Sequence, residues 1–178
     1  GSEMCIRDRV SIISTNSYIF NGTVRDNLLI AKKDATLEEI NYALKKANLL
    51  DFVNSKKEKL DLEVGEGGSK LSGGQKQRLA LARTILANRE VIIFDEATSN
   101  IDVESENMIW KSINEISKEK TVIVISHRLA NVKNADRIYM LDKGILVEEG
   151  SHKDLMERKN KYYGMVNYQN ELEVGGVI

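Results

Sequence analysis

The sequence predicts an α/β fold built on a parallel sheet. Apolar runs at 91–94 and 121–125 have the length of buried strands, and segments with helical spacing of apolar residues precede and separate them. A glycine-rich turn, Leu71–Gln75, stands at the start of one such helix, and Asp95 and Glu96 follow the first strand directly. Open α/β sheets bind ligands at helix starts and strand ends of this kind.

Composition limits the class of protein. The 178 residues suffice for one domain with a sizeable core, and 42% apolar with 30% charged residues is ordinary for a globular protein. The formal net charge of −1 provides no basic field for nucleic acid or anionic lipid. The apolar runs are too short to cross a bilayer, and the single Cys5 excludes an internal disulfide framework.

The first strand is expected at Val10–Ser14, as a buried strand. We expect residues 1–9 to be non-native or artefactual, because residues 4–9 resemble adapter sequence translated at the broken end of an open reading frame. The alternative is an expression scar, Gly1-Ser2, followed by a native segment. The fold prediction therefore covers 10–178.

Helices follow from capping and periodicity. Thr36 to Glu39 has capping-box spacing before apolar residues at helical intervals, and a second short helix should include 51–55. The helix after the glycine-rich turn should present one apolar face, made of Leu79, Ala82, Ile85 and Leu86. Further along, we predict a helix over 102–117, a β-hairpin with its turn at 142–144, and a helix capped by Ser151, with His152 on the surface.

Together these motifs resemble the ATP-binding (nucleotide-binding) domain of exporter-type ABC transporters. LSGGQ at 71–75 resembles that family's signature, VIIFDE at 91–96 its Walker B strand, 99–102 its D-loop, and His127 its switch histidine. The resemblance implies a partial P-loop NTPase (RecA-like) sheet with an inserted helical subdomain. It also implies three parts, at about 16–86 (helical and signature), 87–150 (Walker B and switch histidine) and 151–178 (C-terminal helices).

The signature carries the most specific implication. By the family's architecture it would bind the γ-phosphate of an ATP molecule held by a second nucleotide-binding domain in a head-to-tail dimer. The residues concerned are Leu71, Ser72, Gly73, Gly74 and Gln75. The alternative is a glycine-rich turn that binds nothing.

The two carboxylates would act on the metal and the water. The resemblance gives Asp95 a magnesium ion, held through water because Mg²⁺ dehydrates reluctantly, and gives Glu96 the role of general base. The alternative is that these carboxylates cap the next helix.

Four other positions complete the predicted site. Thr15 stands where the family usually has a Q-loop glutamine, and its shorter side chain would reach a metal only through a water. Ser99 and Asp102 would contact the second subunit, although Asp102 also fits a helix N-cap. His127 would contact the γ-phosphate, and the alternative is a locally satisfied histidine.

No Gly-x-x-x-x-Gly-Lys-Ser/Thr loop occurs in this sequence. The resemblance therefore implies an N-terminally truncated domain, and we predict that the chain alone binds ATP weakly and hydrolyses it negligibly. ATP and Mg²⁺ are the implied cofactors. The implied partners are a second nucleotide-binding domain and a transmembrane domain outside this chain, which would place it at the cytoplasmic face of the membrane; no nucleic acid is implied.

Two other classes of function stay open. A soluble ABC-type ATPase of DNA repair or chromosome maintenance shares these motifs, but it needs long coiled-coil heptads or basic surfaces, and neither is visible. A non-catalytic fragment is the third. Missing sheet strands should leave exposed edges and apolar surface. The glycine-rich segment 62–68 resembles the exporter loop that contacts the membrane domain, or is a simple turn.

Overall fold

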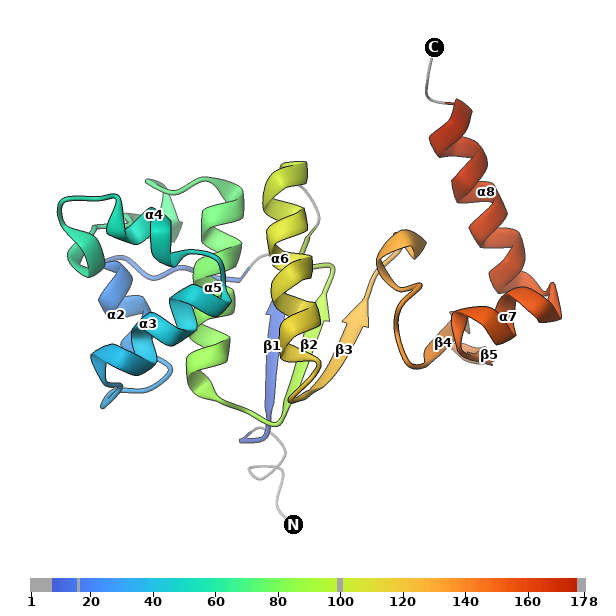
Figure 1. Ribbon diagram of the computed structural model, residues 1–178, viewed down its shortest axis with the longest axis horizontal. Coiled ribbons are helices and arrows are strands. Elements are labelled where there is room, and N and C mark those ends of the chain that lie inside the picture. The colour runs from blue at the N-terminus through green and yellow to red at the C-terminus, as the bar shows by residue number, and fades with distance from the viewer. Residues whose placement is uncertain (1–7, 16, 99–100, 176–178) are drawn as a thin grey trace. The chain divides into compact units, whose positions relative to one another are not determined.

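The computed structural model describes residues 8–15, 17–98 and 101–175. The chain divides into two compact units, which meet between Ile125 and Ser126 and are described separately (Figure 1). Ser99 and most of the segment 1–9 lie outside the described residues, so the expectations about them stay predictions. The predicted three-part division also stays a prediction.

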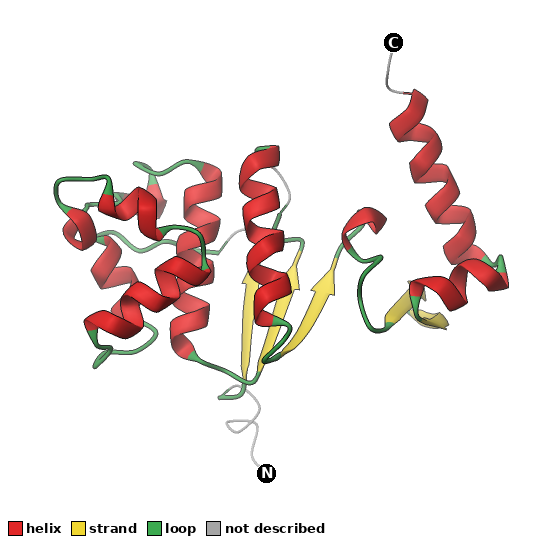
Figure 2. Ribbon diagram, in the orientation of Figure 1, coloured by secondary structure: helices red, strands yellow, loops and turns green. Residues whose placement is uncertain are grey.

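A parallel sheet forms the centre of the first unit, as predicted (Figure 2). The strand order is β1-β2-β3, and the register has no shift: Ser14 lies beside Asp95, and Asp95 beside Ile125. All three carboxyl ends therefore meet at one edge. The strands are β1 (Val10–Ser14), β2 (Val91–Asp95) and β3 (Thr121–Ile125).

Several helices of this unit begin directly after a residue whose side chain caps the helix. Thr36 accepts a hydrogen bond from the Glu39 amide at 3.2 Å, and the Glu39 carboxylate accepts one from the Thr36 amide at 3.0 Å, which confirms the predicted capping box. Thr23 and Asp26 form a second box that the sequence analysis missed. The elements are α2 (Val24–Leu29), α3 (Leu37–Lys46), α4 (Leu50–Asn54), η1 (Lys59–Asp61), η2 (Glu66–Gly68), α5 (Gly73–Ala87) and α6 (Val103–Ile116).

Helix α5 is buried on more than the predicted apolar face, of which Leu79, Ala82 and Leu86 are buried. Ala80 and Leu81 are as buried as Leu79 and Ala82, whereas Ile85 is half-buried. The reason is tertiary: α5 contacts α2, α3, α6 and β1, and so has neighbours on several sides.

The sheet is covered unequally on its two faces. Ile13 and Phe94 pack into the core with residues of α5 and α6, whereas Ile12 is 65% exposed and Ile123 is 47% exposed. The prediction that β1 is buried was therefore wrong for one of its faces. The expected apolar surface on the sheet is confirmed.

The second unit consists of a hairpin and two helices. Lys143 and Gly144 both have positive φ, 49° and 78°, as a two-residue type I′ hairpin turn requires. The predicted hairpin is confirmed, but His152 is half-buried, with Nδ1 2.8 Å from the Tyr162 hydroxyl. The elements are η3 (Leu129–Asn131), β4 (Ile138–Asp142), β5 (Ile145–Gly150), α7 (His152–Arg158) and α8 (Lys161–Gly175). Among the described residues, no helix is long and apolar enough to span a bilayer.

Candidate functional site

The signature turn, residues Leu71–Gln75, is also the N-terminus of α5. Ser72 is the N-cap: its hydroxyl accepts from the Gln75 amide at 3.2 Å, and the Gln75 side chain accepts from the Ser72 amide at 3.0 Å. Leu71 is buried, whereas Ser72 and Gly73 are exposed. The side chains of Ser72 and Gln75 thus cap the helix. The Ser72 hydroxyl hydrogen and the exposed turn at Gly73 remain for a ligand.

Gly74 has a packing role that the sequence analysis missed. A Cβ atom at this position would lie 2.0 Å from the Ser105 hydroxyl oxygen and 2.4 Å from the Ser105 Cβ. Any side chain would therefore push α5 away from α6. Glycine is required here by helix packing, whether or not a phosphate binds.

Asp102 caps α6. Its Oδ1 accepts from the Ser105 amide at 2.8 Å, and this hydrogen bond lowers the pKa of the Asp102 carboxyl. The helix-cap interpretation is confirmed, and the contact with a second subunit stays a prediction.

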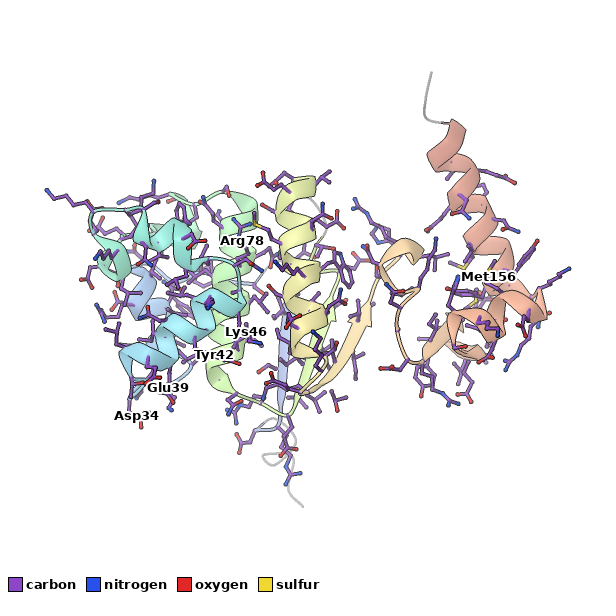
Figure 3. The ribbon with its side chains drawn as sticks, viewed as in Figure 1. Asp34, Glu39, Tyr42, Lys46, Arg78 and Met156 are labelled. Carbon is purple, nitrogen blue, oxygen red and sulfur yellow. The ribbon has the colours of Figure 1, made fainter. Side chains whose placement is uncertain are left out.

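Arg78 connects the same two helices and was also missed. It is only 8% exposed, and its Nη1 lies 2.8 Å from the Met108 sulfur and 3.5 Å from the Ser105 hydroxyl (Figure 3). Burial lowers its pKa, against the opposing effect of Asp102. The spacing from Gly74 to Arg78 was the available signal, because residues four apart share one helix face.

The Walker B edge, Asp95 and Glu96, lies at the carboxyl end of β2. Both residues are exposed, and the Glu96 amide donates to the Ile125 carbonyl at 3.1 Å. Glu96 has φ +49°, in the left-handed region that residues other than glycine rarely adopt. The capping alternative for this pair does not hold, because α6 begins at Val103 and has Asp102 as its cap.

Thr15 lies beside this edge. Its hydroxyl contacts the Glu96 carbonyl oxygen at 3.4 Å. The structure therefore brings Thr15 together with Asp95 and Glu96, although Thr15 and Glu96 are 81 residues apart in the sequence. All three residues were predicted to belong to one site.

Two side chains of α5 hold the segment that follows β1. The Gln77 amide donates to the Thr15 carbonyl at 2.8 Å and to the Ser14 carbonyl at 3.3 Å. Further along α5, Arg83 donates to the Tyr18 carbonyl at 2.9 Å. The sequence analysis named neither Gln77 nor Arg83, because their partners lie more than 60 residues away.

His127 belongs to the second unit and is exposed. Its carbonyl accepts from the Gln169 side chain at 2.6 Å, and Gln169 in turn accepts from the Leu129 amide at 2.9 Å. Helix α8 thus holds the backbone at this position. The predicted contact of His127 with a phosphate stays a prediction.

The comparisons with known proteins decide the family. The model of a family described as "ABC transporter" matches residues 2–99, more than half of the chain. This chain belongs to the ABC transporter family. The resemblance to ABC transporters seen in the signature and Walker B residues is thereby confirmed.

Individual relatives are consistent with this family. An uncharacterized ABC transporter ATP-binding protein of Haemophilus influenzae is 52% identical over 93% of this chain, and an ATP-dependent lipid A-core flippase of Desulfotalea psychrophila is 41% identical over 92%. A bacterial Atm1-family ABC exporter with ATP bound is 38% identical, covers 94% of the chain and gives a TM-score of 0.86. The chain spans 29% of the length of each.

These matches give no support to the DNA-repair alternative. They confirm the α/β fold with its parallel sheet, since the exporter structure superimposes on almost all of this ABC transporter chain.

The Walker B edge suits a magnesium ion that is only partly coordinated by protein side chains. Within the described ranges, no three His, Cys, Asp or Glu side chains gather as a metal cage. The exposed Asp95 carboxylate suits Mg²⁺, which keeps several waters and is completed by phosphate oxygens, and the Thr15 hydroxyl would reach such an ion only through a water.

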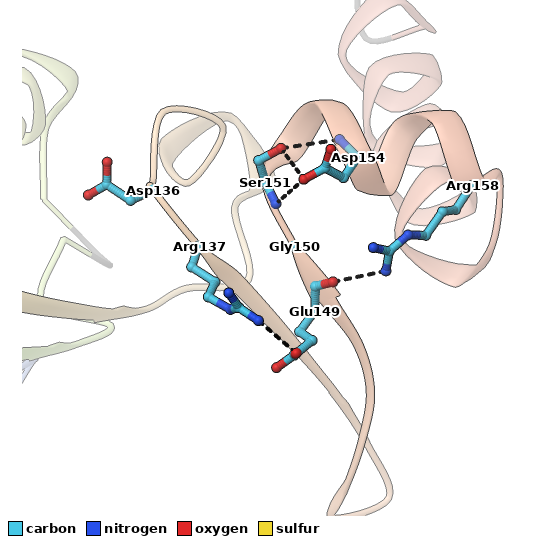
Figure 4. Close-up of a pocket in the computed structure, with 7 residues that line it drawn as sticks. All are labelled: Asp136, Arg137, Glu149, Gly150, Ser151, Asp154 and Arg158. Atoms are coloured by element: carbon cyan, nitrogen blue, oxygen red, sulfur yellow. Dashed lines mark hydrogen bonds and ion pairs between the residues drawn. The ribbon is translucent and has the colours of Figure 1, made fainter.

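A separate hollow lies in the second unit, and none of its lining residues is a predicted site residue (Figure 4). It has a volume of about 320 Å³ and is lined by Asp136, Arg137, Glu149, Gly150, Ser151, Asp154 and Arg158. Arg137 pairs with Glu149 at 2.7 Å, and Ser151 and Asp154 cap α7. Its charges are thus largely satisfied by one another.

Proposed function

We propose that this chain is part of the ATP-binding domain of an ABC exporter, and that the full-length protein hydrolyses ATP to drive transport across a membrane. The observation that carries the proposal is the Walker B edge. Asp95 and Glu96 are exposed at the carboxyl ends of parallel strands, beside Thr15. This edge is where open α/β sheets bind their ligands.

Each residue has a role in the proposed reaction. Asp95 would hold Mg²⁺ through water, and the bound ion would supply positive charge against the phosphate charge that develops during transfer. Glu96 accepts the proton of the attacking water as general base. Thr15 would reach the metal only through a water, and His127 would contact the γ-phosphate and fix the position of the attacking water. Asp102 keeps its second proposed role, at the contact with the other domain.

The signature turn serves a second ATP molecule. The exposed Ser72 hydroxyl and the exposed turn at Gly73, at the positive end of the α5 dipole, would bind the γ-phosphate of ATP held by another nucleotide-binding domain in a head-to-tail dimer. The transmembrane partner of this dimer would place the domain at the cytoplasmic face of the membrane. The chain alone would bind ATP weakly, because its sequence contains no Walker A loop.

Replacement of the general base tests the proposal. In the full-length protein, Glu96→Gln should lower ATP turnover about 100-fold or more, because proton transfer from water is lost. ATP binding, measured with a fluorescent nucleotide, should be retained. Glu119→Gln is the matched control, an exposed carboxylate of the same unit that pairs with Lys46 at 3.8 Å. Normal turnover by Glu96→Gln would refute the role of Glu96.

A further inference from the structure

Gln77 makes an unusual connection within the first unit. Its side chain is only 7% exposed, and its amide donates to two main-chain carbonyls, those of Ser14 and Thr15, at 3.3 and 2.8 Å. Its Oε1 is buried and has no hydrogen-bond partner among the described residues. An unpaired buried acceptor lowers stability. Stability alone therefore does not account well for an amide here.

The carbonyls that Gln77 holds lie beside the Walker B edge. Ser14 is in register with Asp95 in the parallel sheet, and the Thr15 hydroxyl contacts the Glu96 carbonyl at 3.4 Å. A displacement of the backbone at Thr15 would therefore be transmitted to Asp95 by the pairing of β1 with β2, and to Glu96 by the contact of the Thr15 hydroxyl.

The other end of the connection is the signature turn. Gln77 lies in the first turns of α5, which begins at Gly73 with Ser72 as N-cap. Because an α-helix transmits displacement as a rigid body over such a short distance, Ser72 and Gln77 move together. Arg83 adds a second attachment of α5 to the same segment, at the Tyr18 carbonyl, 2.9 Å away.

We propose that Gln77 is a positioning residue that links the signature turn to the Walker B edge through the backbone of Ser14 and Thr15. The inference rests on the proposed function. In that function the signature turn contacts the ATP of one site while Asp95 and Glu96 serve the other. Gln77 then makes the geometry of Glu96 depend on whether the signature turn of the same chain is engaged.

The test distinguishes the hydrogen bonds of the Gln77 amide from the packing of its side chain. Gln77→Met keeps the length of the side chain and removes both donors. In the full-length protein it should lower kcat for ATP about tenfold, because a small misplacement of catalytic groups reduces rate strongly. KM for ATP should change by less than about twofold, since the Gln77 side chain is buried against the main-chain carbonyls of Ser14 and Thr15. Thr15→Val, which removes the hydroxyl facing Glu96, should lower kcat in the same direction, and the two effects should be less than additive because they share one path.

Asn48→Gly is the matched control. The Asn48 amide also joins two segments, through the Met108 carbonyl at 3.2 Å and the Ser112 hydroxyl at 2.9 Å, and its φ of 53° suits glycine. This variant should lose stability and keep kcat. If Gln77→Met matches Asn48→Gly in kcat at equal folded fraction, the inference is wrong.

Two further results complete the test. If Gln77→Met does not fold, the milder Gln77→Asn, whose amide cannot span the same distance, should show the same kcat loss; unchanged kcat there would also overturn the inference. An inactive wild-type protein would instead count against the proposed function itself, so the two failures are distinguishable.

Discussion

The signature turn and the Walker B edge lie in one unit but present different chemistry. At the signature turn, Ser72 and Gln75 cap each other's backbone and Gly74 packs against α6. At the Walker B edge, Asp95 and Glu96 are exposed, and Glu96 has a costly backbone conformation. The turn therefore offers a ligand its main chain and one hydroxyl, whereas the edge offers carboxylate side chains. A sequence motif thus combines residues that build the fold with residues that stay exposed.

The largest effect is expected at the signature turn. Gly74→Ala should lower the free energy of unfolding by about 2 kcal/mol, because its Cβ would overlap Ser105. Urea unfolding of the purified chain measures this. Ser105→Gly in the same chain should restore much of the loss. Gly164→Ala in α8 is the control, since among the described residues no atom outside the local helix backbone lies within 4 Å of a Cβ built there, and alanine there should not destabilise. A Gly74→Ala variant as stable as wild type would mean that the close approach of α5 and α6 is not required.

A smaller effect of opposite sign is expected at the Walker B edge. Glu96→Gly should raise the free energy of unfolding by up to about 1 kcal/mol, because glycine adopts positive φ without a steric penalty. The same variant should abolish ATP hydrolysis in the full-length protein. Glu90→Gly, at an exposed site that lacks a positive φ, should instead be neutral or destabilising. Destabilisation by Glu96→Gly would show that its backbone is not under strain.

The smallest effect concerns Asp102 and pH. Its pKa is lowered in the folded state by the Ser105 amide, so its contribution to stability is complete above the unfolded value of about 3.9 and is lost as the pH falls through the lower folded value. Urea midpoints measured from pH 6 down to pH 2 should fall less steeply for Asp102→Asn than for wild type. Parallel curves for the two proteins would contradict this cap.

Much of the first unit could be predicted from local patterns. The capping box at Thr36 and the strand at 121–125 depend on residues within a few positions of one another, so a short window contains their cause. The same is true of the carboxylates after β2, whose place follows from the end of the strand. Helix α5 was different, because its burial depends on α2, α3 and α6 rather than on its own periodicity.

The amino-acid sequence by itself determined the family, the parallel sheet and the candidate residues Ser72, Asp95 and Glu96. The tertiary structure alone decided which residues support them: Gly74 against Ser105, and Gln77 against Thr15, 62 residues away. The physical reason is the range of the interactions. Turns, caps and strand ends are set by neighbouring residues, whereas close helix packing and buried side-chain bonds to distant carbonyls exist only once the chain has folded.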